Sequence, residues 1–136
     1  MIMRIETSDG SRVVNIGGSD IWYSVYSTVE VRLGLFKRKI PLALQFFKSG
    51  MCGAEDAMET ARQFNLIRDE LSQYTPDKSV YDFRDLKKNA PWHNNLSSVI
   101  TSCANLYTTA DGQDLLYEVV SILCYASIKK VSVSVQ

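Results

Sequence analysis

The chain has 136 residues, of which 46% are hydrophobic and 22% are charged, and its 15 basic residues balance its 15 acidic ones. These values are ordinary for a globular domain and exclude a disordered, collagen-like or coiled-coil chain. A net charge of zero provides no overall field that would attract nucleic acid or an anionic membrane. No apolar run is long enough to span a membrane, and the charged opening residues do not resemble a signal peptide, so we expect a cytoplasmic protein.

The cysteines and the charge distribution give two further indications. Cys52, Cys103 and Cys124 are widely spaced and include no CxxC pair, which favours reduced thiols over a disulfide framework or a zinc site. Residues 1–50 carry seven Lys or Arg against four Asp or Glu, whereas residues 51–136 carry eight against eleven. The second part of the chain therefore leans acidic and would suit a basic partner.

The N-terminal part of the chain reads as a hairpin followed by a helix. Apolar residues at 3–5 and 13–16 flank a Ser-Asp-Gly-Ser sequence, in which Asp-Gly favours a tight turn. After two glycines, Ser19 is expected to cap a helix with apolar residues three and four positions apart. These residues are Trp22, Tyr26, Val29 and Leu33. Residues 29–33 also alternate in polarity, so a strand is the alternative there.

Two further helices are predicted in the middle of the chain. Pro41 suits the first turn of a short helix that runs through Phe47 and ends at Gly50. The clearest helix is predicted at residues 54–74, because one face of it is mostly apolar, and Thr75-Pro76-Asp77 would stop it. The residues of that face are Ala57, Thr60, Phe64, Ile67, Leu71 and Tyr74.

The C-terminal part of the chain is predicted to contain a short strand, a loop and a last helix. Residues 80–83 suit a strand, and residues 89–95 read as a loop. The last helix is expected to have Asp111 as its cap and Asp114 at its third helical position. Its apolar residues are numerous enough to predict deep burial. They are Leu115, Leu116, Val119, Val120, Ile122 and Leu123.

At the end of the chain, valines at 131, 133 and 135 alternate with serines, which predicts a strand with one polar face. Together these elements predict an α+β fold with about three to four helices packed on a small, mainly antiparallel sheet. We expect a single domain that spans residues 1–136.

Few residues point to catalysis. His93 is the only histidine and has no nucleophile signature around it, although Cys103 could in principle pair with it. Gly17-Gly18-Ser19 precedes a helix and could hold an anion, but it lacks a phosphate-binding motif, so a simple turn is favoured. Lys37-Arg38-Lys39 is interpreted as a solvated turn rather than a nucleic-acid patch. Trp92 either covers the core or anchors an interface.

The acidic residues between positions 77 and 114 are all aspartates. They are Asp77, Asp82, Asp85, Asp111 and Asp114. Their spacing matches neither a calcium loop nor a two-carboxylate active site. Asp77 is interpreted as a turn residue and Asp111 and Asp114 as helix caps. Asp82 and Asp85 are either interface residues or ordinary surface.

A series of motifs occurs in a fixed order along the second part of the chain. They are Glu70-Leu71, Pro76-Asp77-Lys78, Tyr81-Asp82 with Asp85-Leu86, Pro91-Trp92, Ile100-Thr101-Ser102, and Thr109 with Asp111-Gly112 and Asp114-Leu115. Their order resembles the immunity protein 70 family of bacterial polymorphic-toxin and contact-dependent growth inhibition systems. Two positions depart from the family pattern: Tyr81 stands where tryptophan is expected, and Ala90 stands where a second proline is expected.

The resemblance implies a protein that binds the toxic C-terminal domain of a CdiA-type or other polymorphic toxin. It implies neutralisation by stoichiometric occlusion, with no enzymatic activity, no cofactor or metal, and no direct contact with nucleic acid or membrane. It favours a nuclease as the toxin, an RNase first of all. The residues expected to contact the toxin are Asp82, Asp85, Trp92, His93, Asp111 and Asp114. The alternative is a small metal- or nucleotide-binding hydrolase that uses the Asp-rich segment.

Overall fold

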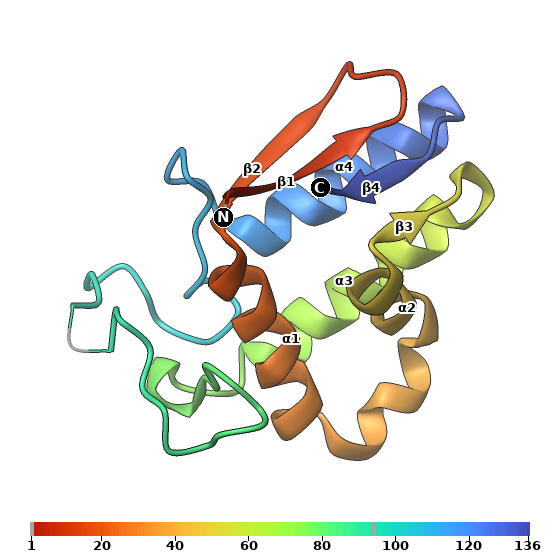
Figure 1. Cartoon of the computed structure of the whole chain (residues 1–136). Coiled ribbons are helices and arrows are strands. Elements are labelled where there is room, and N and C mark those ends of the chain that lie inside the picture. Colours follow the sequence, from red (N-terminus) through yellow and green to blue (C-terminus); the bar gives the residue numbers. More distant parts are fainter. Residues whose placement is uncertain (1, 94) are drawn as a thin grey trace.

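The structure, a computed structural model, describes residues 2–93 and 95–136 (Figure 1). The described residues form four α-helices, namely α1 (Ser19–Arg32), α2 (Pro41–Ser49), α3 (Ala57–Leu71) and α4 (Leu115–Lys129). They also form the strands β1 (Ile2–Thr7), β2 (Val13–Gly18), β3 (Met51–Cys52) and β4 (Val133–Val135). Three short 3-10 helices complete these elements: η1 (Gly34–Lys39), η2 (Ala54–Asp56) and η3 (Pro76–Lys78). The predicted α+β class is confirmed.

The four strands form one antiparallel sheet in the order β2-β1-β4-β3. The predicted hairpin of β1 and β2 is confirmed, and its turn is closed by Asp9, which accepts hydrogen bonds from the N–H and the hydroxyl of Ser11. Gly10 takes a left-handed backbone conformation there with φ of 74°. β4 pairs with β1, so the last strand of the chain lies between the first strand and β3 (Figure 1).

The helices cover one face of this sheet. Ile5, Val14 and Val133 are buried on the face that α4 covers, whereas the neighbouring Arg4 and Val13 are exposed. This alternation is the period-two pattern of a sheet with one solvated face. α3 packs along α4 and begins beside β3, where Thr60 of α3 lies 3.5 Å from the thiol of Cys52 (Figure 1).

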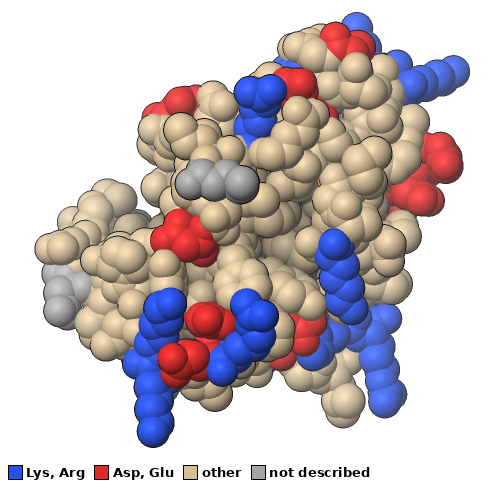
Figure 2. All heavy atoms as spheres, in the orientation of Figure 1, with Lys and Arg blue, Asp and Glu red and all other residues tan. Residues whose placement is uncertain are grey.

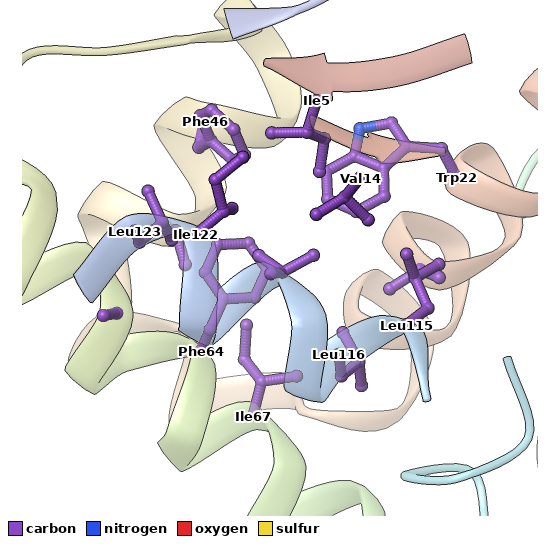
Figure 3. Packing of buried hydrophobic residues seen from close by; sticks show 14 of the residues in the cluster. Ile5, Val14, Trp22, Phe46, Phe64, Ile67, Leu115, Leu116, Ile122 and Leu123 are labelled. Carbon is purple, nitrogen blue, oxygen red and sulfur yellow. The ribbon is translucent and has the colours of Figure 1, made fainter. Parts of the chain in front are cut away.

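Residues from all four α-helices and from the sheet form one hydrophobic core (Figure 3). Three aromatic rings join the helices there. Phe46 of α2 lies 6.1 Å from Trp22 of α1 and 6.1 Å from Phe64 of α3, edge-on in both pairs. Leu116 and Ile122 of α4 are completely buried beside them. A fully buried large apolar side chain stabilises a fold by roughly 1.5–3 kcal/mol, so this core is the main source of stability.

The short helix α2 begins and ends largely as predicted. Pro41 occupies its first turn, and Gly50 ends it with a left-handed φ of 72°. Its first turn is capped by a side chain from α3, because Gln63 Oε1 accepts hydrogen bonds from the N–H groups of Leu42 and Ala43 at 2.7 and 3.0 Å. Gln63 is buried, so this long-range cap fixes α2 against α3.

Several local predictions need correction at helix ends. Ser19 is the first helical residue of α1 and Gly18 is the N-cap, so Ser19 does not cap the helix. α1 continues to Arg32, and the strand alternative at 29–33 is wrong. The helix predicted at 54–74 consists of η2 followed by α3, which ends at Leu71.

Further corrections concern the C-terminal part of the chain. The strand predicted at 80–83 is absent, and this segment is irregular because side chains of α1 bind its backbone. Asp114, not Asp111, caps α4: its carboxylate accepts a hydrogen bond from the N–H of Tyr117, while Asp111 lies in the preceding turn. Of the predicted loop at 89–95, the described residues 89–93 and 95 lie in no helix or strand, and Asn94 lies outside the described residues.

Candidate functional site

A long segment between η3 and α4 lies beside α1 (Figure 1, green to cyan). Its described residues, 79–93 and 95–114, form no helix or strand apart from an isolated bridge between Thr108 and Asp114. This segment, which we call the α1-side segment, contains all six residues that the sequence nominates for partner contact. Its position therefore decides where those residues lie.

Tyr107 anchors the α1-side segment to α1 through a ring of hydrogen bonds. The N–H of Val80 donates to Thr28 Oγ1 at 2.8 Å, and Thr28 lies 2.8 Å from the Tyr107 hydroxyl. Tyr107 lies 3.0 Å from Ser24 Oγ, which donates to the carbonyl of Val80 at 2.8 Å. If the Thr28 hydroxyl donates to Tyr107 and the Tyr107 hydroxyl donates to Ser24, each of the three hydroxyls donates one hydrogen bond and accepts one. Burial raises the pKa of Tyr107 to about 12, so its hydroxyl stays protonated.

Trp92 packs against the molecule instead of projecting from it. Its ring lies 5.6 Å from that of Tyr81 and 6.4 Å from that of Tyr107, edge-on in both cases. The hydroxyl of Tyr81 in turn donates to Asp20 Oδ2 at 2.8 Å. Trp92 is half-buried against the hydrophobic core, and these contacts favour the interpretation that it covers the core.

Aromatic side chains gather on the outer side of α1. We define the α1 aromatic surface as Tyr23, Tyr26, Phe47 and Phe83. Tyr26 lies 5.3 Å from Phe47 and 5.7 Å from Phe83, and Tyr23 lies 5.7 Å from Phe83, measured between ring centroids. Phe83 is held in place because its N–H donates to the buried hydroxyl of Ser27, yet its side chain remains 36% exposed. Side chains from α1, α2 and the α1-side segment therefore build one partly exposed aromatic surface.

A groove with a volume of about 440 Å³ opens beside the α1 aromatic surface, where α1, α2 and β1 meet. We call it the α1 groove. Its walls include Met3, Asp20, Trp22, Tyr23, Tyr26 and Phe47. Figure 2 shows this side of the molecule, where uncharged atoms fill the centre, single charged groups lie around them, and charged groups of both signs alternate along the lower edge. An aromatic centre with a charged rim is the usual composition of a protein–protein binding surface.

Charged residues along the edge of the α1 aromatic surface are paired within the chain. Asp82 accepts hydrogen bonds from the hydroxyl of Tyr23 at 3.3 Å and from the N–H of Arg84 at 2.9 Å. Glu30 forms a partly exposed ion pair with Lys37 at 2.9 Å. The pKa of Tyr26 is raised to about 12, mainly because the side chain is partly buried and secondly because the Glu30 carboxylate is close to it.

The other nominated residues occupy different surroundings. Asp85 is exposed and accepts a hydrogen bond from the N–H of Lys87 in a local turn. His93 is exposed and lines a separate cavity of about 290 Å³. Asp111 lies in an exposed turn, and Asp114 caps α4 and borders another cavity near α3. Of the six, only Asp82 contacts the α1 aromatic surface directly, so the six residues do not form a single cluster.

Comparison with known families identifies the chain. The family model of immunity protein 70 matches residues 7–135. The chain belongs to the immunity protein 70 family. The match covers nearly the whole chain and confirms the resemblance inferred from the motifs between residues 70 and 115. No curated protein and no solved structure matches this chain.

Membership of the immunity protein 70 family makes this an immunity protein against a polymorphic toxin and implies that it binds a cognate toxin. The family indicates a binding protein rather than an enzyme. Consistent with this, Cys103 is poorly suited to nucleophilic catalysis with His93: its thiol is buried, donates to the carbonyl of Thr75 at 3.3 Å, and has a pKa that burial raises to about 11.

The described residues contain neither a candidate metal site nor a helix that could cross a membrane. Within residues 2–93 and 95–136, no three His, Cys, Asp or Glu side chains gather into a group that could hold a metal ion. The metal-binding alternative for the Asp-rich segment therefore has no supporting site in those residues. The described helices also include none that is long and apolar enough to cross a membrane.

Sequence reasoning missed most of the α1 aromatic surface and the acidic residue in the α1 groove. Tyr23, Phe83 and Asp20 were not nominated, and Tyr26 was assigned to the core-facing stripe of the helix. One signal was available: Trp22 and Tyr23 are adjacent, and neighbouring residues on a helix point about 100° apart. Both aromatic rings could not face the core, so one of them had to lie towards the surface.

Proposed function

We propose that this immunity protein binds the toxic C-terminal domain of its cognate toxin through the α1 aromatic surface and the adjoining α1 groove. The complex would be stoichiometric, and the bound immunity protein would occlude either the active site or the substrate-binding surface of the toxin. The observation that carries this proposal is the partly exposed aromatic surface with a charged edge, because aromatic anchors contribute most of the binding energy in such interfaces. The whole chain would act as one immunity domain.

The nominated residues take different roles in this proposal. Asp82 lies at the edge of the α1 aromatic surface through its hydrogen bond with Tyr23, so we assign it a rim contact with the toxin. Asp85 and His93, both exposed on the α1-side segment, are proposed as outer contacts, and Trp92 supports the segment from beneath. Asp111 and Asp114 remain proposed contacts at the periphery of the interface.

The cognate toxin is proposed to be a nuclease, with an RNase as the first candidate, delivered by a CdiA-type or another polymorphic system. A cleft that binds nucleic acid must be basic, because the phosphate backbone dominates such binding. Asp20 in the wall of the α1 groove, which has no described Lys or Arg nitrogen within 4 Å, would attract and pair with a basic residue of such a cleft. The immunity protein would act in the cytoplasm of the producing cell.

The test is binding to the toxin domain encoded immediately upstream, followed by substitution within the surface. The two proteins should co-purify in equal amounts, and the immunity protein should restore growth of cells that express the toxin domain. Phe83→Ala removes a partly exposed ring and should weaken binding by roughly 10- to 30-fold, as expected for an interface hot spot.

The matched control is Tyr117→Ala, which removes an aromatic side chain that is 54% exposed on α4. It should change the dissociation constant by no more than about 3-fold. Thermal unfolding of each variant separates loss of binding from loss of folding. Absence of any complex with wild-type protein, or equal weakening by the two substitutions, would contradict the proposal.

A further inference from the structure

The α1 groove is aromatic, but one carboxylate lies in its wall. Asp20 belongs to the first turn of α1, and its Oδ2 accepts a hydrogen bond from the hydroxyl of Tyr81 at 2.8 Å. Among the described residues, no Lys or Arg nitrogen comes within 4 Å of this carboxylate. No described Lys or Arg lines the groove either. The charge of Asp20 is therefore available to a cation that comes from outside the described chain.

Beside the α1 groove, the side chain of Arg84 already lies between an aromatic ring and a carboxylate. The guanidinium carbon of Arg84 lies 5.3 Å from the centre of the Tyr23 ring, and Arg84 Nε lies 3.9 Å from Asp82 Oδ1. Here an aromatic face and a carboxylate together hold a guanidinium group. Tyr23 also lines the α1 groove, so the two arrangements share a side chain.

The α1 groove offers the same combination without a described cation in it. Its aromatic wall is formed by Trp22, Tyr23, Tyr26 and Phe47, and Trp22 and Phe47 lie only 4.8 Å apart between ring centroids. Aromatic rings attract cations through the negative potential of their faces, and they also pack well against the methylene groups of lysine and arginine. A volume of about 440 Å³ is within the range of roughly 300–1,000 Å³ that is usual for ligand pockets.

We propose that the α1 groove binds the side chain of one lysine or arginine of the toxin domain. The methylene groups of that residue would pack against the partly exposed rings of Tyr26 and Phe47, next to the buried ring of Trp22, and its charged end would pair with Asp20. This inference rests on the proposed function, and it specifies that the toxin domain presents a basic side chain to the groove. A basic residue in a nuclease cleft contacts phosphate, so capture of that residue would also remove a contact that the substrate needs.

The first experiment measures the dissociation constant of the complex with a catalytically inactive toxin domain. Asp20→Asn keeps the shape of the side chain and an acceptor for Tyr81 but removes the charge. It should weaken binding by roughly 10- to 100-fold at low salt, and by less at high salt because ions screen the lost attraction.

The matched control for this experiment is Glu55→Gln, which likewise removes one carboxylate charge, at an exposed position of η2. It should change the dissociation constant by no more than about 3-fold. If Asp20→Asn weakens binding no more than Glu55→Gln does, the inference is overturned.

The second experiment does not need the toxin. N-acetylarginine methylamide and its neutral citrulline counterpart are titrated into the immunity protein, and the indole N–H resonance of Trp22 is followed by NMR. The arginine compound should shift this resonance in a saturable manner and bind at least about 5-fold more tightly than the citrulline compound, since only the former carries charge. Asp20→Asn should abolish the difference.

Equal binding of the two compounds, or shifts that leave Trp22 unchanged, would overturn the inference. A groove that prefers arginine in a protein that forms no complex with the toxin domain would refute the proposed function while supporting the chemistry of the groove. The two proposals therefore fail by different results.

Discussion

The ring of hydrogen bonds around Tyr107 makes a quantitative prediction about stability. Tyr107→Phe removes the hydroxyl that lies 2.8 Å from Thr28 Oγ1 and 3.0 Å from Ser24 Oγ. Each of these hydrogen bonds contributes about 0.5–1.5 kcal/mol net. Ser24 and Thr28 can still donate to the carbonyl of Val80, at 2.8 and 3.2 Å, so no buried donor loses its last acceptor. We therefore expect a loss of about 1–2 kcal/mol in the free energy of unfolding.

Thr28→Val should cost more, although it conserves the volume of the side chain. Thr28 Oγ1 is the acceptor for the N–H of Val80, and valine would leave that buried donor without a partner. An unpaired buried donor costs about 1–3 kcal/mol in addition to the lost hydrogen bonds, so we expect a total of about 3 kcal/mol.

Urea unfolding measures both effects. The control is Tyr117→Phe, because the hydroxyl of Tyr117 is in no hydrogen bond with the described residues and the side chain is 54% exposed. It should change stability by no more than about 0.5 kcal/mol. If Tyr107→Phe matches this control, or if Thr28→Val costs no more than Tyr107→Phe, the ring does not hold the α1-side segment on α1 and the reasoning is refuted.

The raised pKa of Tyr107 predicts how the free energy of unfolding changes at alkaline pH. The pKa of Tyr107 rises from an ordinary value of 10.0 to about 12 on burial, so the folded state keeps a proton that the unfolded state loses. The stability linked to Tyr107 is complete below pH 10 and is lost as the pH rises through 12. Cys103 acts in the same direction between about pH 9 and 11. The urea midpoint should fall over this range, and it should fall less in the Tyr107→Phe variant.

Two further predictions concern helix caps. Asp114→Ala should lower the unfolding free energy by about 1 kcal/mol because it removes the cap of α4. Asp111→Ala, in an exposed turn, should change it by no more than about 0.5 kcal/mol. Equal losses in urea unfolding would contradict the cap assignment. Gln63→Leu removes the acceptor for the N–H groups of residues 42–43 and should cost about 2–4 kcal/mol, with loss of amide-exchange protection at those two residues. Retained protection would contradict this role, and Gln45→Leu, at an exposed position of α2, serves as the control.

The elements that sequence predicted well are those with a local periodic pattern. α3 follows from an apolar face with helical spacing, and the β1–β2 hairpin follows from an Asp-Gly turn between apolar runs. The strand prediction at 80–83 fails because it uses only the apolar and aromatic composition of that segment, whereas the backbone there is held by Ser24 and Thr28, more than 50 positions away. Such a distant side-chain partner leaves no trace in the segment itself. Gln63, which caps α2 from α3, was missed for the same reason.

The candidate site was predictable only in part. The motifs between residues 70 and 115 identify the family, and the structure shows that several of them serve the fold: Trp92 packs on Tyr81 and Tyr107, and Asp114 caps α4. The α1 aromatic surface combines α1, α2 and the α1-side segment, so it exists only after folding. Motif positions therefore indicate the fold of this immunity protein more directly than they indicate its contact surface.

Hydrogen exchange of the immunity protein, free and with the inactive toxin domain, tests the central claim most directly. If the α1 aromatic surface binds the toxin, backbone amides of the outer side of α1, of the region around Phe47 and of residues 82–84 should exchange more slowly in the complex. The amides of the turn between β1 and β2, at residues 8–12 and at the far end of β1 from the groove, should exchange at an unchanged rate. A complex that protects the hairpin and leaves α1 and residues 82–84 unchanged would contradict the account.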